Sequence, residues 1–226
     1  MRVIIIVIFI SISVLTNGQN RHLNLGFGEY GLCLGNSRNF NGLRLNFIDK
    51  NVDLLNGLNI SLISKYNKTN GVKIAFHSIS NKTNGLNLTI WGIDDKISNG
   101  LAIATGIGGD KLNGFGIGLL GVSADTINGF YFTGLIGTSN WSTDPIDIVN
   151  GVTIGIICGI QAEELNGIAI GINNSTDIQK GITIGLLNST RNLYGIQLGL
   201  WNVVENNRIF KRTPIINFNF RRKASR

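Results

Sequence analysis

Apolar residues fall at every second place after a recurring glycine, and this alternation fills most of the chain. The stretch KGITIGLLN (180–188) is followed fourteen residues later by YGIQLGLWN (194–202). Eleven such phrases align on the glycine that opens each one, with spacings of 14 to 16 residues and one of 22. Their glycines are Gly42, Gly57, Gly71, Gly85, Gly100, Gly114, Gly129, Gly151, Gly167, Gly181 and Gly195. A fixed period of this length predicts a repeat architecture.

The alternation predicts β-strands with one buried face. Residues one and three places after each glycine are apolar in all eleven phrases, and the residue five places after it is apolar except at Thr105 and Gly134. The places between are polar in the early phrases and small in the later ones. We expect the apolar columns to point into the core. The expected outward residues of the early phrases are Arg44, Asn59, Lys73 and Asn87.

Two all-β architectures use such strands: a parallel β-solenoid with about 14 residues per coil, and an antiparallel β-barrel. In an antiparallel sheet the turns at the two ends differ, so the period would double to about 28 residues. Asn precedes nine of the eleven glycines, so the same Asn-Gly corner recurs once per phrase. The sequence therefore favours the solenoid and keeps the barrel as the alternative. In a solenoid, Asn174, Asn188 and Asn202 would stack as an amide ladder.

The pattern divides the chain into four parts. The start has a basic Arg2 followed by an apolar run of 13 residues, which fits a signal peptide and is shorter than the roughly 20 residues of a membrane-spanning helix. A repeat array also needs caps over its exposed strand edges. The predicted parts are a signal peptide (1–18), an N-terminal cap (19–41), an eleven-repeat β array (42–204) with an inserted loop near 138–149, and a closing strand with a basic tail (205–226).

Of the net charge of +7, +6 comes from the C-terminal end of the chain and +1 from Arg2, and none comes from the repeats. Residues 3–204 hold 12 Lys and Arg and 12 Asp and Glu, whereas residues 205–226 hold seven basic residues and one acidic residue. A basic tail on an exported protein does not indicate nucleic-acid binding. Solvation is the first interpretation of this tail, and contact with anionic lipid head groups is the second.

No group of residues predicts a catalytic, cofactor-binding or metal-binding site. His22 and His77 are the only histidines, and zinc needs three or four converging ligands. GIGGDK (106–111) lacks the spacing of a phosphate-binding loop. The adjacent acidic pairs 94–95 and 163–164 point apart on an extended chain, so we expect solvated turns there.

Two further small-residue features have structural interpretations. Cys33 and Cys158 fall in coils too far apart for a disulfide, so we expect buried thiols. Glycines also recur four places after the opening glycine of the later phrases, and we expect them on the face opposite the core. Their repeated entropic cost indicates close approach of the coil's own return leg or of a partner surface. These glycines are Gly155, Gly171, Gly185 and Gly199.

The phrases GITIGLLN and GIQLGLWN, with the ending PIINFNF, resemble the glycine-rich surface-repeat proteins of Gram-negative bacterial envelopes. The resemblance covers about residues 41–220 and implies an exported or surface-located protein, with no enzymatic activity and no site residues to transfer. The chain departs from outer-membrane barrels, which end on an aromatic residue, because Phe220 is followed by RRKASR.

Three functions remain open from the sequence. The first is an exported, non-enzymatic protein with a structural or binding role at the cell envelope, outer-membrane-associated or extracellular. Its candidate partners are envelope polysaccharide, an anionic lipid surface or another protein. The second is an outer-membrane β-barrel or pore protein. The third is an enzyme, for which the sequence offers no constellation of residues. The oligomeric state is not predicted.

Overall fold

The computed structural model describes residues 22–134, 137–138, 146–157 and 159–220, and this part of the chain is entirely β. Strand residues lie on both legs of each coil, so several coils join into one long winding element. The strands are β1 (His22–Phe27), β2 (Tyr30–Gly35), β3 (Asn39–Leu45), β4 (Val52–Thr133), β5 (Gly137–Thr138), β6 (Ile146–Gly155), β7 (Gln161–Ile170), β8 (Asn173–Ile184), β9 (Leu187–Val204) and β10 (Arg212–Asn219).

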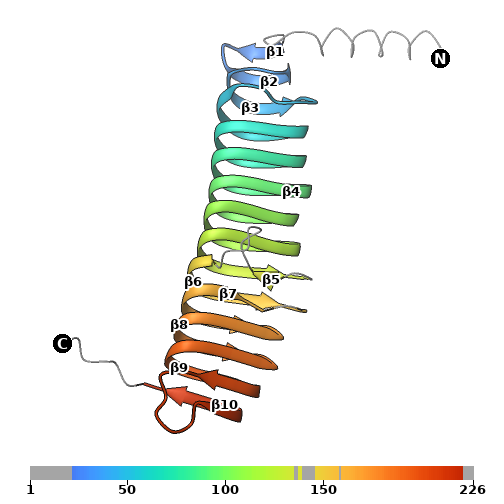
Figure 1. The fold of residues 1–226 in the computed structure, drawn as a ribbon. Coiled ribbons are helices and arrows are strands. Elements are labelled where there is room, and N and C mark those ends of the chain that lie inside the picture. The colour runs from blue at the N-terminus through green and yellow to red at the C-terminus, as the bar shows by residue number, and fades with distance from the viewer. Residues whose placement is uncertain (1–21, 135–136, 139–145, 158, 221–226) are drawn as a thin grey trace, which may run out of the picture.

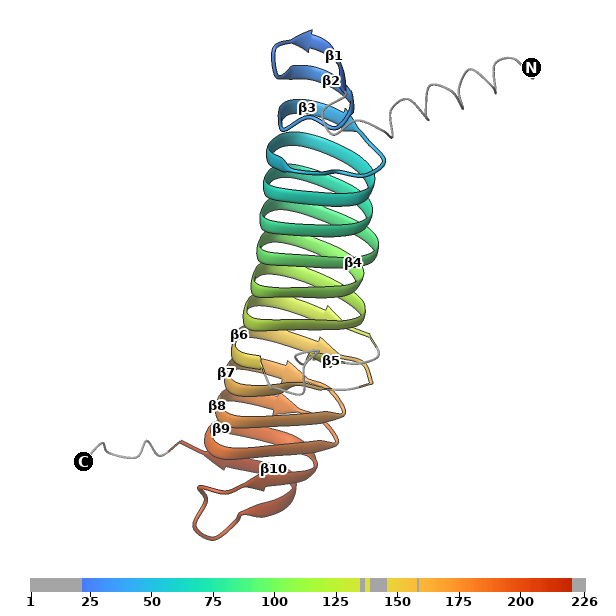
Figure 2. The same cartoon turned by 45° about the horizontal axis from the view of Figure 1, so that its top comes forward.

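The repeats stack as parallel coils into a rod, which confirms the predicted β-solenoid (Figures 1 and 2). Neighbouring phrases pair in register, glycine beside glycine, as in Gly42 with Gly57 and Gly167 with Gly181. The antiparallel alternative is wrong for these repeats, because every pairing from β2 to β9 is parallel. β4 carries several coils without a break, as its winding in Figure 1 shows.

Antiparallel strands lie at both ends of the rod (Figure 1). At the first end β1 runs antiparallel to β2, while β2 pairs in parallel with β3 and aligns Gly31 with Gly42. At the other end β10 runs antiparallel to β9, with a shift of register between Thr213 and Ile215. Pro214 lies at that shift, where its missing N–H interrupts the ladder. Residues 139–145 of the predicted inserted loop lie outside the described residues.

The backbone at the Asn-Gly corner determines which side chains of the following strand point into the coil. Gly57 and Gly100 have φ of 124° and 122°, and a Cβ at either position would collide with the glycine carbonyl of the preceding coil. Beside this glycine stack the asparagines form a continuous amide ladder, which we call the Asn ladder. Each Nδ2 donates to the Oδ1 of the preceding coil at 2.6–2.9 Å, through Asn41, Asn56, Asn70, Asn84, Asn99, Asn113, Asn128, Asn150 and Asn166. The ladder and the glycine stack thus align successive coils.

The predicted orientation of the strand faces is wrong: the apolar columns point outward and the column between them points inward. Arg44, Asn59, Lys73 and Asn87, expected outside, are each 0% exposed. A strand's side chains alternate between its two faces, so the corner alone decides which set is enclosed. Here the residue two places after each glycine is enclosed in all eleven phrases.

The return leg of a coil, which is the part between one phrase strand and the next, supplies most of the apolar side chains of the interior. The residue two places before each opening glycine is buried in all eleven repeats. It is apolar in seven of them: Phe40, Leu55, Leu112, Ile127, Val149, Leu165 and Leu193. In the third to fifth repeats it is Thr69, Thr83 and Ser98, which face the coils whose phrase strands carry Lys73 and Asn87. In these repeats the two legs match in polarity, whereas Phe40 and Leu55 are apolar in the repeats that carry Arg44 and Asn59.

The late glycines do not lie opposite the core, which corrects a second expectation. A Cβ at Gly185 would collide with the carbonyl of Gly171 in the preceding coil and crowd the Asn174 amide. The close approach that these glycines allow is therefore made by the protein's own backbone. The amide ladder predicted beside them is confirmed, since Asn174 Nδ2 donates to Asn188 Oδ1 and Asn188 Nδ2 to Asn202 Oδ1, both at 2.8 Å.

Candidate functional site

One side of the rod is an exposed sheet of apolar side chains, which we call the apolar face. It consists of the residues one, three and five places after the eleven opening glycines, and 31 of these 33 positions are apolar. None of the 33 is charged. Because every residue two places after a glycine is enclosed, these three columns are the outward set of the phrase strands.

Exposure rises across the apolar face, away from the Asn ladder. The column next to the ladder is mostly half-buried, because neighbouring coils cover part of each side chain. In the second column Ile60 and Ile74 are each 40% exposed. The third column is the most open, with Ile90 at 70% and Leu200 at 68%. Large aromatic residues contribute as well, and the Phe115 and Phe130 rings stack in parallel with centroids 5.1 Å apart.

The opposite side of the rod, formed by the return legs, exposes charged side chains together with apolar ones such as Trp91, Ile97 and Leu187, and is called the charged face here. Its exposed or half-buried charged residues are Arg38, Lys50, Asp53, Lys65, Lys68, Lys82, Asp94, Lys96, Asp110, Lys111, Asp125, Asp147, Glu163, Glu164, Asp177 and Arg191. Ion pairs join successive coils, as between Arg191 and Asp177 at 2.9 Å. The rod is therefore amphipathic across its width, with all these charges on one side.

The N-terminal interior holds two buried ion pairs that share one aromatic ring. Arg44 Nη2 lies 2.7 Å from Asp49 Oδ1 and donates at the same distance to the Tyr66 hydroxyl, which in turn donates to Asp49. The Arg44 guanidinium also lies 5.1 Å from the Tyr66 ring centroid, and Lys73 Nζ lies 5.7 Å from it. Burial, followed by the negative charge of Asp49, raises the pKa of Tyr66 well above its ordinary value. Tyr66 is therefore a neutral hydrogen-bond donor in this network.

Lys73 is the centre of the second pair, in the coils that follow. Its Nζ donates to hydroxyls of Ser78, Ser80 and Thr83 at 2.8 Å and lies 3.3 Å from Asp95 Oδ1. Burial lowers the pKa of Lys73, and the facing carboxylate of Asp95 opposes that shift. Asp95 is 0% exposed, so the solvated turn expected at this position is wrong, although Asp94 beside it is exposed. Both pairs are enclosed by coils, so each charge depends on its buried partner for compensation.

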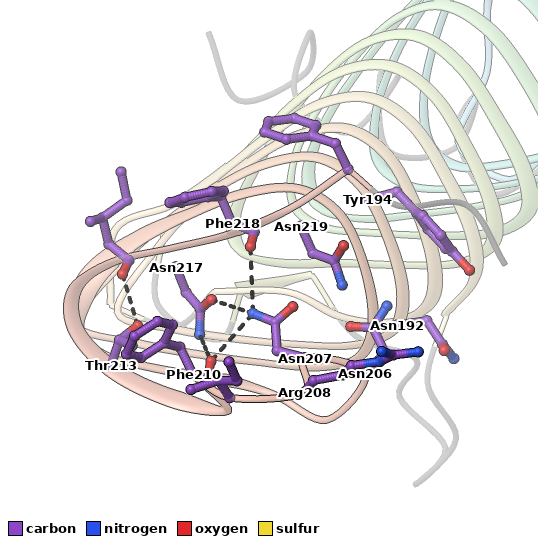
Figure 3. Close-up of a pocket in the computed structure, with 13 residues that line it drawn as sticks. Asn192, Tyr194, Asn206, Asn207, Arg208, Phe210, Thr213, Asn217, Phe218 and Asn219 are labelled. Carbon is purple, nitrogen blue, oxygen red and sulfur yellow. Dashed lines mark hydrogen bonds between the residues drawn. The ribbon is translucent and has the colours of Figure 1, made fainter.

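A pocket lies at the C-terminal end of the rod, between the last coil and β10 (Figure 3). Several asparagines and phenylalanines line it, but the amides are engaged in closing the end. Asn207 Nδ2 donates to Asn217 Oδ1 at 2.7 Å, and Asn217 Nδ2 donates to the Phe210 carbonyl at 3.1 Å. Asn206 bonds both backbone groups of Leu193. Figure 3 shows Asn207 and Asn217 pointing toward each other, as expected of a cap.

The remaining candidate residues of the sequence lie apart from one another. His22 begins β1, whereas His77 is half-buried in β4, and its Nδ1 has no partner. Cys33 is a free thiol enclosed in β2, and burial raises its pKa; Cys158 lies outside the described residues. Glu163 is exposed in β7, and its neighbour Glu164 accepts a bond from Lys180 at 2.7 Å. Hydrogen bonds from Lys180 and Asn166 lower the pKa of Glu164.

Within the described ranges, no three His, Cys, Asp or Glu side chains converge as metal ligands. No helix in the same part of the chain is long and apolar enough to cross a membrane. Comparison of the chain with family models, with curated proteins and with solved structures gives no match. The apolar face is thus the feature of the described molecule that most needs a functional explanation.

Sequence reasoning found the residues of the apolar face but assigned them to the core. The sequence holds one signal that distinguishes an inward from an outward orientation of the apolar columns. It lies in the residues two places after each opening glycine. That column varies from Arg44 and Lys73 to Ala102, Gly116 and Tyr131, whereas its apolar neighbours keep one character throughout. An enclosed side chain must fit the other interior side chains of its own coil, and these differ from coil to coil. The size and polarity of the residues in an enclosed column are therefore expected to vary along the rod.

Proposed function

We propose that this chain is an exported, non-enzymatic surface-repeat protein with a structural or binding role at the cell envelope. One observation carries the proposal: an uncharged apolar face runs along the repeat array, backed by a charged face on the other side. Soluble monomers rarely leave contiguous apolar patches larger than about 300–600 Å². A rod with this face is suited to present it to another surface.

The size of the apolar face supports a binding role. Eleven coils at ~4.8 Å give a length of ~50 Å, and five strand residues at ~3.3 Å give a width of ~17 Å. The resulting footprint, roughly 850 Å², is close to the area that one partner contributes to a standard protein interface, about 800 Å². The predicted signal peptide and the resemblance to envelope surface-repeat proteins favour the envelope as the location.

The chemistry of the face favours some partners over others. Sugar hydroxyls are recognised by amides, carboxylates and hydroxyls, and the apolar face offers one side-chain hydroxyl, that of Thr105, which already donates to the Ile90 carbonyl at 2.6 Å. Polysaccharide is therefore disfavoured as the occupant of this face. A protein surface or a lipid surface would each remove the apolar side chains from water.

Fractionation of a Gram-negative host that expresses the full chain tests this function. We expect cleavage after residue 18, detected by the mass of the chain, and recovery in the envelope or outside the cell. The double variant Ile60→Lys/Ile74→Lys should be exported equally but should lose its envelope partner in pull-down. Ile97→Lys/Ile148→Lys is the matched control, because these two residues are 36% and 37% exposed on the charged face. An uncleaved cytoplasmic chain would contradict the proposal. So would equal capture of the envelope partner by the wild-type chain, the double variant and the control variant.

A further inference from the structure

We propose that the apolar face is the interface with a second copy of this chain, so that two rods pack face to face. This inference rests on the proposed function and identifies its partner. Its starting point is the exposed, uncharged strand surface described above, whose middle column includes Ile60, Ile74 and Ile184 at 39–40% exposure. Nothing else in the described chain covers these side chains.

The geometry of the face suits a copy of itself. Its three apolar columns form ridges that run along the rod, with one side chain per coil at a spacing of ~4.8 Å. A second copy presents ridges of the same spacing, so the ridges of one rod can lie in the furrows of the other over the whole length. Sheets that pack in this way lie ~10 Å apart with interdigitated side chains. A two-fold axis makes such an interface self-complementary.

The area and composition of the face also fit a stable dimer. A footprint of roughly 850 Å² on each rod reaches the size of standard specific interfaces. The centres of protein interfaces are depleted in charge and enriched in aromatic residues. The apolar face has no charged residue, and Phe47, Phe76, Phe115, Phe130 and Phe132 lie on it. No charge of one copy would therefore be buried without a partner.

A lipid surface is a weaker occupant on these observations. Chains that lie on membranes place Lys and Arg around their apolar face, where they meet anionic head groups. Here one edge of the apolar face is the Asn ladder, in whose column Lys180 is the one cation and is paired with Glu164. Lys65, Lys68 and Lys82 are on the opposite side of the rod. A dimer would direct both charged faces to water, which agrees with the surface ion pairs found there.

Sedimentation velocity tests the proposal on the purified chain, with its N-terminus defined by mass spectrometry. The wild-type chain should sediment as a dimer in buffer without detergent. Ile60→Lys/Ile74→Lys should sediment as a monomer, with a dimer dissociation constant raised by at least about a hundredfold, because association would bury unpaired ammonium groups. Ile97→Lys/Ile148→Lys adds the same two charges on the charged face and should remain dimeric. Circular dichroism verifies that each variant is folded.

Other outcomes overturn the proposal, and the wild-type result decides even if a variant fails to fold. A monomeric wild-type chain excludes the second copy, and a dimer that survives in the folded double variant places the interface elsewhere. Flotation with vesicles of phosphatidylcholine, alone or mixed with phosphatidylglycerol, separates this failure from that of the proposed function. Monomers that float, and lose flotation in the double variant, replace the second copy by lipid and leave a binding role intact. Monomers that neither float nor capture an envelope partner remove both proposals.

Discussion

The N-terminal and central parts of the rod enclose the same narrow space with opposite chemistry. Between Arg44 and Asp95 the interior holds two ion pairs and a set of hydroxyls and amides, beside a small apolar cluster that includes Phe40 and Leu55. Beyond them it becomes a continuous apolar cluster, which includes Leu112, Ile127 and Leu165 at 0% exposure. The outer columns do not change at this transition: they are apolar over both interiors. The apolar face is therefore not a by-product of the core.

This difference has an energetic consequence. The polar interior depends on mutual satisfaction, because the attraction within a buried pair does little more than offset the loss of hydration. The apolar interior depends on packing and on removal of surface from water. Loss of one charged group should therefore be more damaging than loss of several methylenes. The following changes test that ranking, beginning with the largest expected effect.

Asp95→Leu should lower the free energy of unfolding by about 3–5 kcal/mol, because Lys73 would remain buried without its carboxylate. The double variant Lys73→Met/Asp95→Leu should recover most of this loss, since it removes both charges while leaving the nearby hydroxyls. Urea denaturation followed by circular dichroism measures both. Equal destabilisation by the single and the double variant would contradict the role assigned to the pair.

Leu112→Ala should cost about 2–4 kcal/mol, the usual range for a buried leucine that leaves a cavity. No ionisable group is removed, so the loss should be the same at pH 5 and pH 8. The same denaturation experiment at both pH values is the check. A loss larger than that of Asp95→Leu would reverse the proposed order of the two interiors.

The sequence predicts the strands, the period, the parallel stacking and the ladder of Asn174, Asn188 and Asn202, because each depends only on spacing. It does not predict which face is enclosed. Alternation is symmetric, and a shift of one residue exchanges inside and outside. The phase is set by the backbone at the corner, where Gly57 stacks on Gly42. The partners of Lys73 were equally hidden, since Asp95 is 22 residues away and meets it only after the coils close.

The Asn ladder crosses both interiors and should be equally important over each. Asn70 and Asn113 each donate to one neighbour at 2.7 Å and accept from another at 2.7 Å. Asn70→Ala lies over the polar interior and Asn113→Ala over the apolar one. Each should lose about 1–2 kcal/mol, the net value of two hydrogen bonds. Matching losses in denaturation would show that the corner acts independently of the core, whereas a large difference would couple the two.

The smallest expected effect concerns the charged face above the apolar interior. Asp125 is exposed and lies in a column with Asp110 and Asp147. Partial desolvation, and then the negative charges of Asp110 and Asp147, raise the pKa of Asp125. A carboxyl with a raised pKa in the folded state contributes stability that is fully present below its unfolded pKa, about 4, and is lost as the pH rises through the folded value.

Asp125→Asn should therefore stabilise the protein at pH 7 by less than about 0.5 kcal/mol, seen as a slightly higher melting temperature. The substitution should have no such effect at pH 3. Melting curves at both pH values, with Lys82→Gln as a control on the basic part of the same face, measure the difference. A gain at pH 3 equal to that at pH 7 would show that repulsion between these carboxylates is not its cause.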